Sequence, residues 1–142
     1  MTIRHDCVAA ELTVRLVQPG GPPLPLAARI RYEQDDPFAV TVDFHTGPDS
    51  MVTWTFARDL LRDGVDAPSG EGDVQVWPAK LGGGPVSLEV SSPSGHALFE
   101  LPRQKVVAFL ERTYAAVPLD TESRHFDVEA FLSTLTGLGP EG

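Results

Sequence analysis

The sequence predicts an α+β fold in which two packed or curled antiparallel β-sheets, about seven strands together, carry one short and two longer helices at one end. Three observations favour this class. Apolar and polar residues alternate with a period of two through most of the first hundred residues, Pro- and Gly-rich turns separate the alternating runs, and apolar residues recur at helical spacing afterwards. The sequence lacks the strand-helix-strand alternation that builds a parallel nucleotide-binding sheet.

Four strands are predicted in the first half of the chain. Leu12 and Val14 point to one face of the first strand, whereas Thr13 and Arg15 point to the other, which is typical of a half-buried strand. Trp54 belongs to the inward register of the fourth strand, so we expect it in the core. The four predicted strands cover residues 8–16, 28–32, 38–44 and 52–56, with turns at 19–25, 34–37 and 45–50.

The second half repeats this layout without repeating the sequence. A short helix is expected over residues 57–63, ended by Gly64 in a left-handed conformation. Pro102 suits the first turn of a longer helix that ends before Pro118, and Asp127 can cap a last helix. Three further strands are expected between the short and the longer helix, over residues 74–77, 86–90 and 96–101.

Length and charge limit the classes of partner. The 142 residues fit one domain, 1–142, with a core over 8–135 and a short flexible C-terminal tail. The formal net charge of −9 disfavours nucleic acid and anionic membrane surfaces as partners. One cysteine cannot form an intramolecular disulfide, and neither a signal peptide nor a membrane-spanning stretch is predicted. We therefore expect a cytoplasmic protein with no direct membrane insertion.

Catalytic, metal and cofactor sites are not predicted. The histidines at positions 5, 45, 96 and 125 lack the spacing of metal ligands, and no G-x-S-x-G motif marks a nucleophile. The glycines at 82–84 precede Pro85 and no Lys-Ser/Thr pair, so a hairpin loop is favoured over a phosphate-binding loop.

Trp77 is a candidate for protein interaction. If Val74 and Val76 face the core, Trp77 points to the opposite side of its strand. A large aromatic side chain there meets solvent, lies under a loop or a second sheet, or belongs to an interface.

The short helix carries the other candidates, Arg58, Asp59, Arg62 and Asp63. Leu60 and Leu61 are expected to bury this helix, which leaves the four charged residues outward. Such residues form either a solvated face with weak ion pairs or a surface that binds a partner.

Several segments resemble the SsgA-like proteins of morphologically complex actinomycetes, and the SsgB group most. These segments follow one another in the family's order and together cover most of residues 8–132. The Pro-rich reversal at 19–25 and the tail TGLGPEG depart from the family pattern. The matching segments are RYEQDDPFAVTVDFHTG at 31–47, ARDLL and GDVQVWP within 54–78, SSPSGHALFELP at 91–102 and FLERTYAAVPLDTESRHFD at 109–127.

The resemblance implies a function in sporulation-type cell division. It implies a non-enzymatic scaffolding protein without a cofactor that acts at division septa, where it localises the tubulin-like protein FtsZ and promotes its assembly. It also implies another SsgA-like protein as a partner, a homotrimer, and a two-sheet fold similar to the Whirly single-stranded nucleic-acid binders. The alternative is a Whirly-like single-strand binder, which needs a basic groove with exposed aromatic residues. The 11 basic residues against 20 acidic ones disfavour it.

Overall fold

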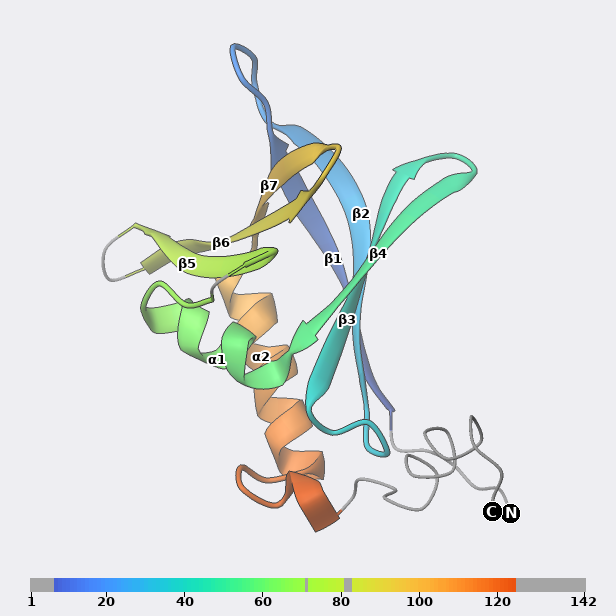
Figure 1. Ribbon diagram of the computed structural model, residues 1–142, viewed down its shortest axis with the longest axis vertical. Coiled ribbons are helices and arrows are strands. Elements are labelled where there is room, and N and C mark those ends of the chain that lie inside the picture. Colours follow the sequence, from blue (N-terminus) through green and yellow to red (C-terminus); the bar gives the residue numbers. More distant parts are fainter. Residues whose placement is uncertain (1–6, 71, 81–82, 125–142) are drawn as a thin grey trace.

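Seven antiparallel strands form one sheet in a computed structural model that describes residues 7–70, 72–80 and 83–124 (Figure 1). The strand order is β4-β3-β2-β1-β7-β6-β5. The strands are β1 (Cys7–Val17), β2 (Leu24–Glu33), β3 (Ala39–Gly47), β4 (Ser50–Ala57), β5 (Val74–Lys80), β6 (Gly83–Ser92) and β7 (Gly95–Leu101). The seven predicted strands are therefore confirmed, with longer ranges than the sequence predicted.

The prediction of two sheets is wrong. Strands β1 to β4 form one meander and β5 to β7 form a second, as the repeated layout of the sequence predicts. The end of β1 pairs with β7, and Leu16 lies opposite Phe99, so backbone hydrogen bonds join the two meanders into a single sheet. Likeness to the Whirly fold stays a prediction.

The sheet curls into a half-barrel whose concave face carries the core. Phe44 on β3 and Phe99 on β7 stack with ring centroids 4.0 Å apart, although two strands separate them in the sheet. The buried residues follow the predicted inward register in most strands. Phe38 is an exception, because it precedes β3 and is exposed.

Two helices lie on the concave side, towards one end of the half-barrel (Figure 1). They are α1 (Arg58–Asp66) and α2 (Arg103–Ala116), and a short 3-10 helix η1 (Glu122–Arg124) follows. The helix predicted from Asp127 lies outside the described residues. Between the β1–β2, β3–β4 and β6–β7 hairpins, the other end of the half-barrel is open.

Gly64 lies inside the short helix, whereas the sequence predicted that Gly64 would end it. Its conformation is not left-handed, and α1 continues to Asp66. A Cβ atom at Gly64 would collide with the side chain of Val76 on β5 and lie 2.9 Å from the Val76 carbonyl oxygen. Close packing of α1 against β5 therefore explains this glycine better than helix termination does.

Candidate protein-interaction site

Arg58, the first residue of α1, is buried with 1% of its surface exposed. The expected outward orientation of this side chain is therefore wrong. Leu61 and Val65 are also buried, and the three residues share one face of the helix at i, i+3 and i+7. Helical periodicity could thus have placed Arg58 on the buried face from the sequence.

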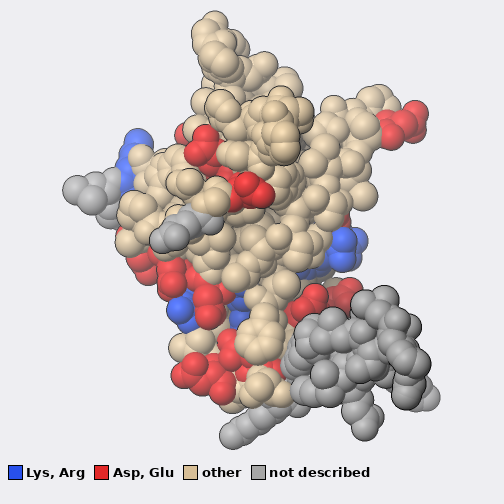
Figure 2. Space-filling model, viewed as in Figure 1, with Lys and Arg blue, Asp and Glu red and all other residues tan. Residues whose placement is uncertain are grey.

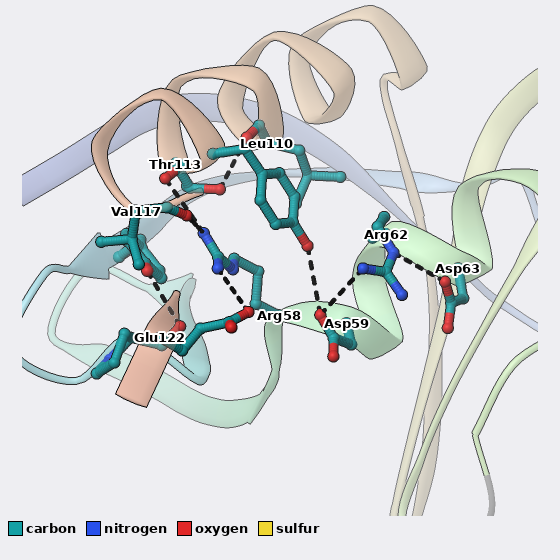
Figure 3. Close-up of polar contacts among 11 residues, drawn as sticks. Arg58, Asp59, Arg62, Asp63, Leu110, Thr113, Val117 and Glu122 are labelled. Carbon is teal, nitrogen blue, oxygen red and sulfur yellow. Dashed lines mark hydrogen bonds and ion pairs between the residues drawn. The ribbon is translucent and has the colours of Figure 1, made fainter. Parts of the chain in front are cut away.

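The Arg58 guanidinium holds the C-terminal end of α2. Its Nη1 donates to the carbonyl oxygens of Thr113, at 3.1 Å, and Val117, at 2.8 Å. Its Nη2 donates to Glu122 Oε2 at 2.9 Å (Figure 3). Because the last carbonyls of a helix lack intrahelical partners and form the negative end of its dipole, a cation at this position stabilises α2.

Two aromatic rings flank the same guanidinium. Its Cζ lies 3.9 Å from the ring centroid of Tyr114 and 4.9 Å from that of Tyr32. Burial raises the pKa of the Tyr32 phenol to about 12, although the Arg58 cation opposes that shift. The planar, delocalised guanidinium suits both the carbonyl contacts and the rings, which a lysine ammonium would not.

Glu122 supplies the negative charge of this cluster and is 7% exposed. Burial alone would raise the pKa of its carboxyl group. Hydrogen bonds from the backbone and from Arg58 outweigh burial and lower the pKa below its ordinary value. The cluster therefore joins β2, α1, α2 and η1 through an ionised, buried pair.

The other three charged candidates, Asp59, Arg62 and Asp63, lie on the accessible side of α1, as predicted. Asp59 and Asp63 have side chains that are 55% and 54% exposed, and Arg62 is 36% exposed. Arg62 pairs with Asp59 at 3.3 Å and with Asp63 at 2.9 Å, and Tyr114 Oη lies 3.4 Å from Asp59 Oδ1 (Figure 3). Hydrogen bonding to Asp63 raises the pKa of Arg62. α1 thus presents a mixed-charge surface.

Trp77 lies away from this surface. Val76 is fully buried against α1, so Trp77, the next residue of β5, points to the opposite face of the sheet. Trp77 is half-buried and lies directly opposite Ser87 of β6. The structure therefore does not bring Trp77 together with Asp59, Arg62 and Asp63.

An apolar cleft of about 370 Å³ at the open end of the half-barrel is a feature that the sequence analysis missed. Among the described residues, those that line it include no Asp, Glu, Lys or Arg, although His96 and three hydroxyl residues are present. The nearby Leu24, Met51 and Val52 are 44%, 55% and 45% exposed. The apolar lining includes Leu16, Leu26, Val52, Trp54, Val90 and Phe99.

Three charge-free segments of the sequence, 16–28, 50–57 and 90–99, contribute all but one of the residues that are known to line this cleft. Charged residues gather instead over the half that contains the helices, while uncharged residues dominate the open end apart from the tip of the β3–β4 hairpin (Figure 2). These segments were the signal from which the cleft could have been predicted. An uncharged surface of this kind on an acidic protein is typical of an association surface.

The part of the chain that the structure describes was searched for metal-binding groups and for membrane-spanning helices. Within it, no three His, Cys, Asp or Glu side chains are grouped so that they could bind a metal ion. None of its helices has the length and apolar character required to cross a bilayer.

Comparison with known sequences identifies the family. The family described as Streptomyces sporulation and cell division protein, SsgA, matches residues 26–122. The sporulation-specific cell division protein SsgB of Frankia casuarinae is 61% identical over 142 residues, which cover 99% of each chain. SsgB of Streptomyces coelicolor is 50% identical over 130 residues, 91% of this chain and 95% of that protein.

Solved structures agree with this assignment. A structure from work on SsgB mutations that correlate with longitudinal cell division during sporulation of Streptomyces coelicolor superposes with a TM-score of 0.82 at 47% identity, covering 89% of this chain and 100% of that chain. The SsgA-like sporulation-specific cell division protein of Thermobifida fusca gives a TM-score of 0.81 at 38% identity, over 95% and 99% of the two chains. Sequence and structure together show that the chain belongs to the SsgA family of sporulation and cell-division proteins.

Proposed function

We propose that this protein is a non-enzymatic scaffold of sporulation-specific cell division, which localises FtsZ at septum sites and promotes its assembly. Family membership supports the role in sporulation cell division. The roles of FtsZ and of another SsgA-like protein as partners rest on the resemblance of the sequence segments described above. The protein acts in the cytoplasm by equilibrium binding and needs no cofactor.

The separation of two unlike surfaces is the observation that carries this proposal. The open end of the half-barrel is a largely apolar cleft, and the described residues that line it include no Asp, Glu, Lys or Arg, whereas α1 carries exposed charges of both signs on the other half (Figure 2). An apolar surface suits contacts between copies of one chain, and a charged surface suits a selective partner. A closed homotrimer joined near the cleft would thus display several copies of α1.

Multivalent display gives this arrangement a physical mechanism. An oligomer that holds several FtsZ subunits raises their effective local concentration, which favours filament formation at the chosen site. The binding surface includes Asp59, Arg62 and Asp63, and Trp77 provides a separate contact on the opposite face of the sheet. Arg58 positions α1 from inside the fold and does not reach the partner.

Single-stranded nucleic-acid binding is less well supported. A groove for single strands combines positive charge along the phosphates with aromatic rings that stack on the bases. Trp54 and Phe99 line the cleft, but no Lys or Arg accompanies them in the part of its lining that the structure describes.

Sedimentation of purified FtsZ with and without this protein tests the proposal. We expect more FtsZ in the pellet when the protein is present, and we expect the protein to pellet with it. An unchanged pellet, with the protein left in the supernatant, would contradict the recruiting function. Binding of mixed-sequence oligonucleotides at micromolar or lower concentration in physiological salt would instead favour the nucleic-acid alternative.

A further inference from the structure

A groove runs between α1 and α2, which lie antiparallel. Tyr114 near the end of α2 contacts Asp59 near the start of α1, and Arg103 at the start of α2 donates to the carbonyl oxygen of Val65 near the end of α1. The groove has a volume of about 500 Å³. Arg62 lines the groove and also belongs to the α1 surface that the proposed function assigns to the partner.

The floor of this groove is apolar. Val65 and Leu110 are each 6% exposed and form its base, and the half-buried Val107 and Tyr114 widen it. A pair of antiparallel helices with an apolar strip between them accepts a third helix, because ridges of one helix fit into the grooves of the others. The shape therefore favours an amphipathic helix as the occupant.

The rim of the groove offers exposed carboxylates on both walls. Asp66 on α1 and Glu111 on α2 line it and are exposed. Asp59 and Asp63 do not line the groove, but they contact two residues that do, Tyr114 and Arg62. The Arg62 cation is already paired with these two aspartates.

The second cation of the groove, Arg103, is also engaged by the protein. Its Nε donates to the carbonyl oxygen of Gly84 at 2.9 Å and its Nη2 to that of Val65 at 2.6 Å. Both guanidinium groups are thus directed at acceptors of the protein itself, although Arg103 keeps its positive charge. Among the described residues, the carboxylates of Asp66 and Glu111 are the charged groups of the groove that are left to contact an incoming ligand. The net charge of −9 attracts a cationic ligand over a longer distance as well.

We propose that the groove between α1 and α2 binds a short cationic amphipathic helix of a partner protein. Apolar side chains of this helix pack on Val65, Val107 and Leu110, and its Lys or Arg residues pair with Asp66 and Glu111 on the two walls. The nine residues of α1 span about 14 Å, which corresponds to about two to three turns of the bound helix. The inference rests on the proposed function in one respect, that α1 belongs to the partner-binding surface.

Two synthetic peptides test the groove without FtsZ. The first is a Lys/Leu amphipathic helix of about three turns, and the second has the same sequence with Glu in place of every Lys. Amide chemical shifts of the full-length, isotope-labelled protein report where and how strongly each peptide binds. We expect the Lys peptide to shift the amides of α1 and α2 and to bind about tenfold more tightly than the Glu peptide.

Matched variants distinguish peptide binding in the groove from general electrostatic attraction to the acidic protein. The double substitution Asp66→Lys with Glu111→Lys should weaken binding of the Lys peptide by about tenfold. Asp49→Lys with Glu33→Lys changes the net charge equally at exposed positions outside the groove, and should weaken binding by less than about twofold.

Several outcomes would overturn the proposal. Equal affinity for the two peptides, equal weakening by both double variants, or shifts confined to the apolar cleft would each show that the groove is not a site for cationic helices. If the protein fails to alter FtsZ sedimentation while the peptide results hold, the proposed recruiting function fails and the groove stands as the site of another partner.

Discussion

Arg58 at the start of α1 donates a 2.9 Å hydrogen bond to Glu122, which lies 64 residues later in the chain, and both side chains are buried. The pair joins the helix that carries the exposed charges to the end of the described chain. A buried cation normally requires such a partner, because desolvation of a lone charge costs several kcal/mol. This contact therefore holds α1 against η1, while the bonds from the same guanidinium to the Thr113 and Val117 carbonyls hold α1 against the end of α2.

Replacement of Arg58 should destabilise the fold strongly. Arg58→Met keeps most of the side-chain volume but leaves the buried Glu122 carboxylate without its cation and the carbonyl oxygens of Thr113 and Val117 without the side chain that donates to them. We expect the free energy of unfolding to fall by about 3 to 5 kcal/mol, measured by urea denaturation. Lys105→Met is the matched control on an exposed position of α2 and should change stability by less than about 0.5 kcal/mol. Similar values for the two variants would show that the buried pair contributes little.

Acid should weaken the same contact in a defined pH range. The pKa of Glu122 in the folded protein is lower than its ordinary value of 4.5, so its ionised form stabilises the fold above pH 4.5. This contribution is lost as the pH falls through the folded pKa. Glu122→Gln removes the titrating group, so the difference in unfolding free energy between wild type and this variant should be constant above pH 5 and shrink below pH 4.5. A difference that does not change with pH would contradict the ionised pair.

A side chain at position 64 should force α1 away from β5. A Cβ atom at Gly64 collides with Val76, so we expect Gly64→Ala to cost about 1 to 3 kcal/mol of stability. Val76→Gly in the same chain removes both the Cγ1 and the Cβ that the new atom meets, so it should recover part of that loss, which a double-mutant cycle detects. Gly21→Ala has open space around its Cβ and is the matched control. Additive effects of the substitutions at 64 and 76 would argue against the proposed collision.

The sequence was sufficient to predict local structure and insufficient for the long-range contacts. Period-two alternation predicted every strand, because residues such as Val14, Ile30 and Val42 must all face one core. The pairing of Leu16 with Phe99 joins segments that are far apart in the chain, and alternation alone does not determine which strands pair. One sheet was therefore mistaken for two.

The candidate site was only partly predicted, again because the sequence indicates local structure better than long-range packing. Asp59, Arg62 and Asp63 are accessible because their positions on α1 point away from the sheet, as the predicted helix indicated. Arg58 was misplaced because charge was taken as a sign of exposure, although its spacing from Leu61 and Val65 placed it on the buried face. Its partner Glu122 depends on the packing of α2 and η1, which no local pattern encodes.

A charge in the apolar cleft should disrupt association between copies of the chain. Val52 is 45% exposed in the single chain, so Val52→Asp should affect folding only modestly, yet a carboxylate buried in an interface without a partner is costly. Light scattering over a concentration series should give a trimer mass for wild type and a monomer mass for Val52→Asp. Thr13→Asp, on the exposed face of β1, is the matched control and should remain a trimer. A monomeric wild-type protein at tens of micromolar would remove the basis of multivalent binding.

Charge reversal on α1 should separate recruitment from stability. Asp63 is 54% exposed and its ion pair with Arg62 lies at the surface, so Asp63→Lys should change the free energy of unfolding by no more than about 1 kcal/mol. If α1 contacts FtsZ, the variant should carry several-fold less FtsZ into the pellet in co-sedimentation. Glu11→Lys makes the same change of charge at an exposed position of β1, where it also removes a surface ion pair, with Arg29, and it should retain wild-type recruitment. Equal recruitment by both variants, with both folded and trimeric by light scattering, would exclude this part of α1 and direct attention to Trp77, whose substitution by Ala tests the opposite face of the sheet.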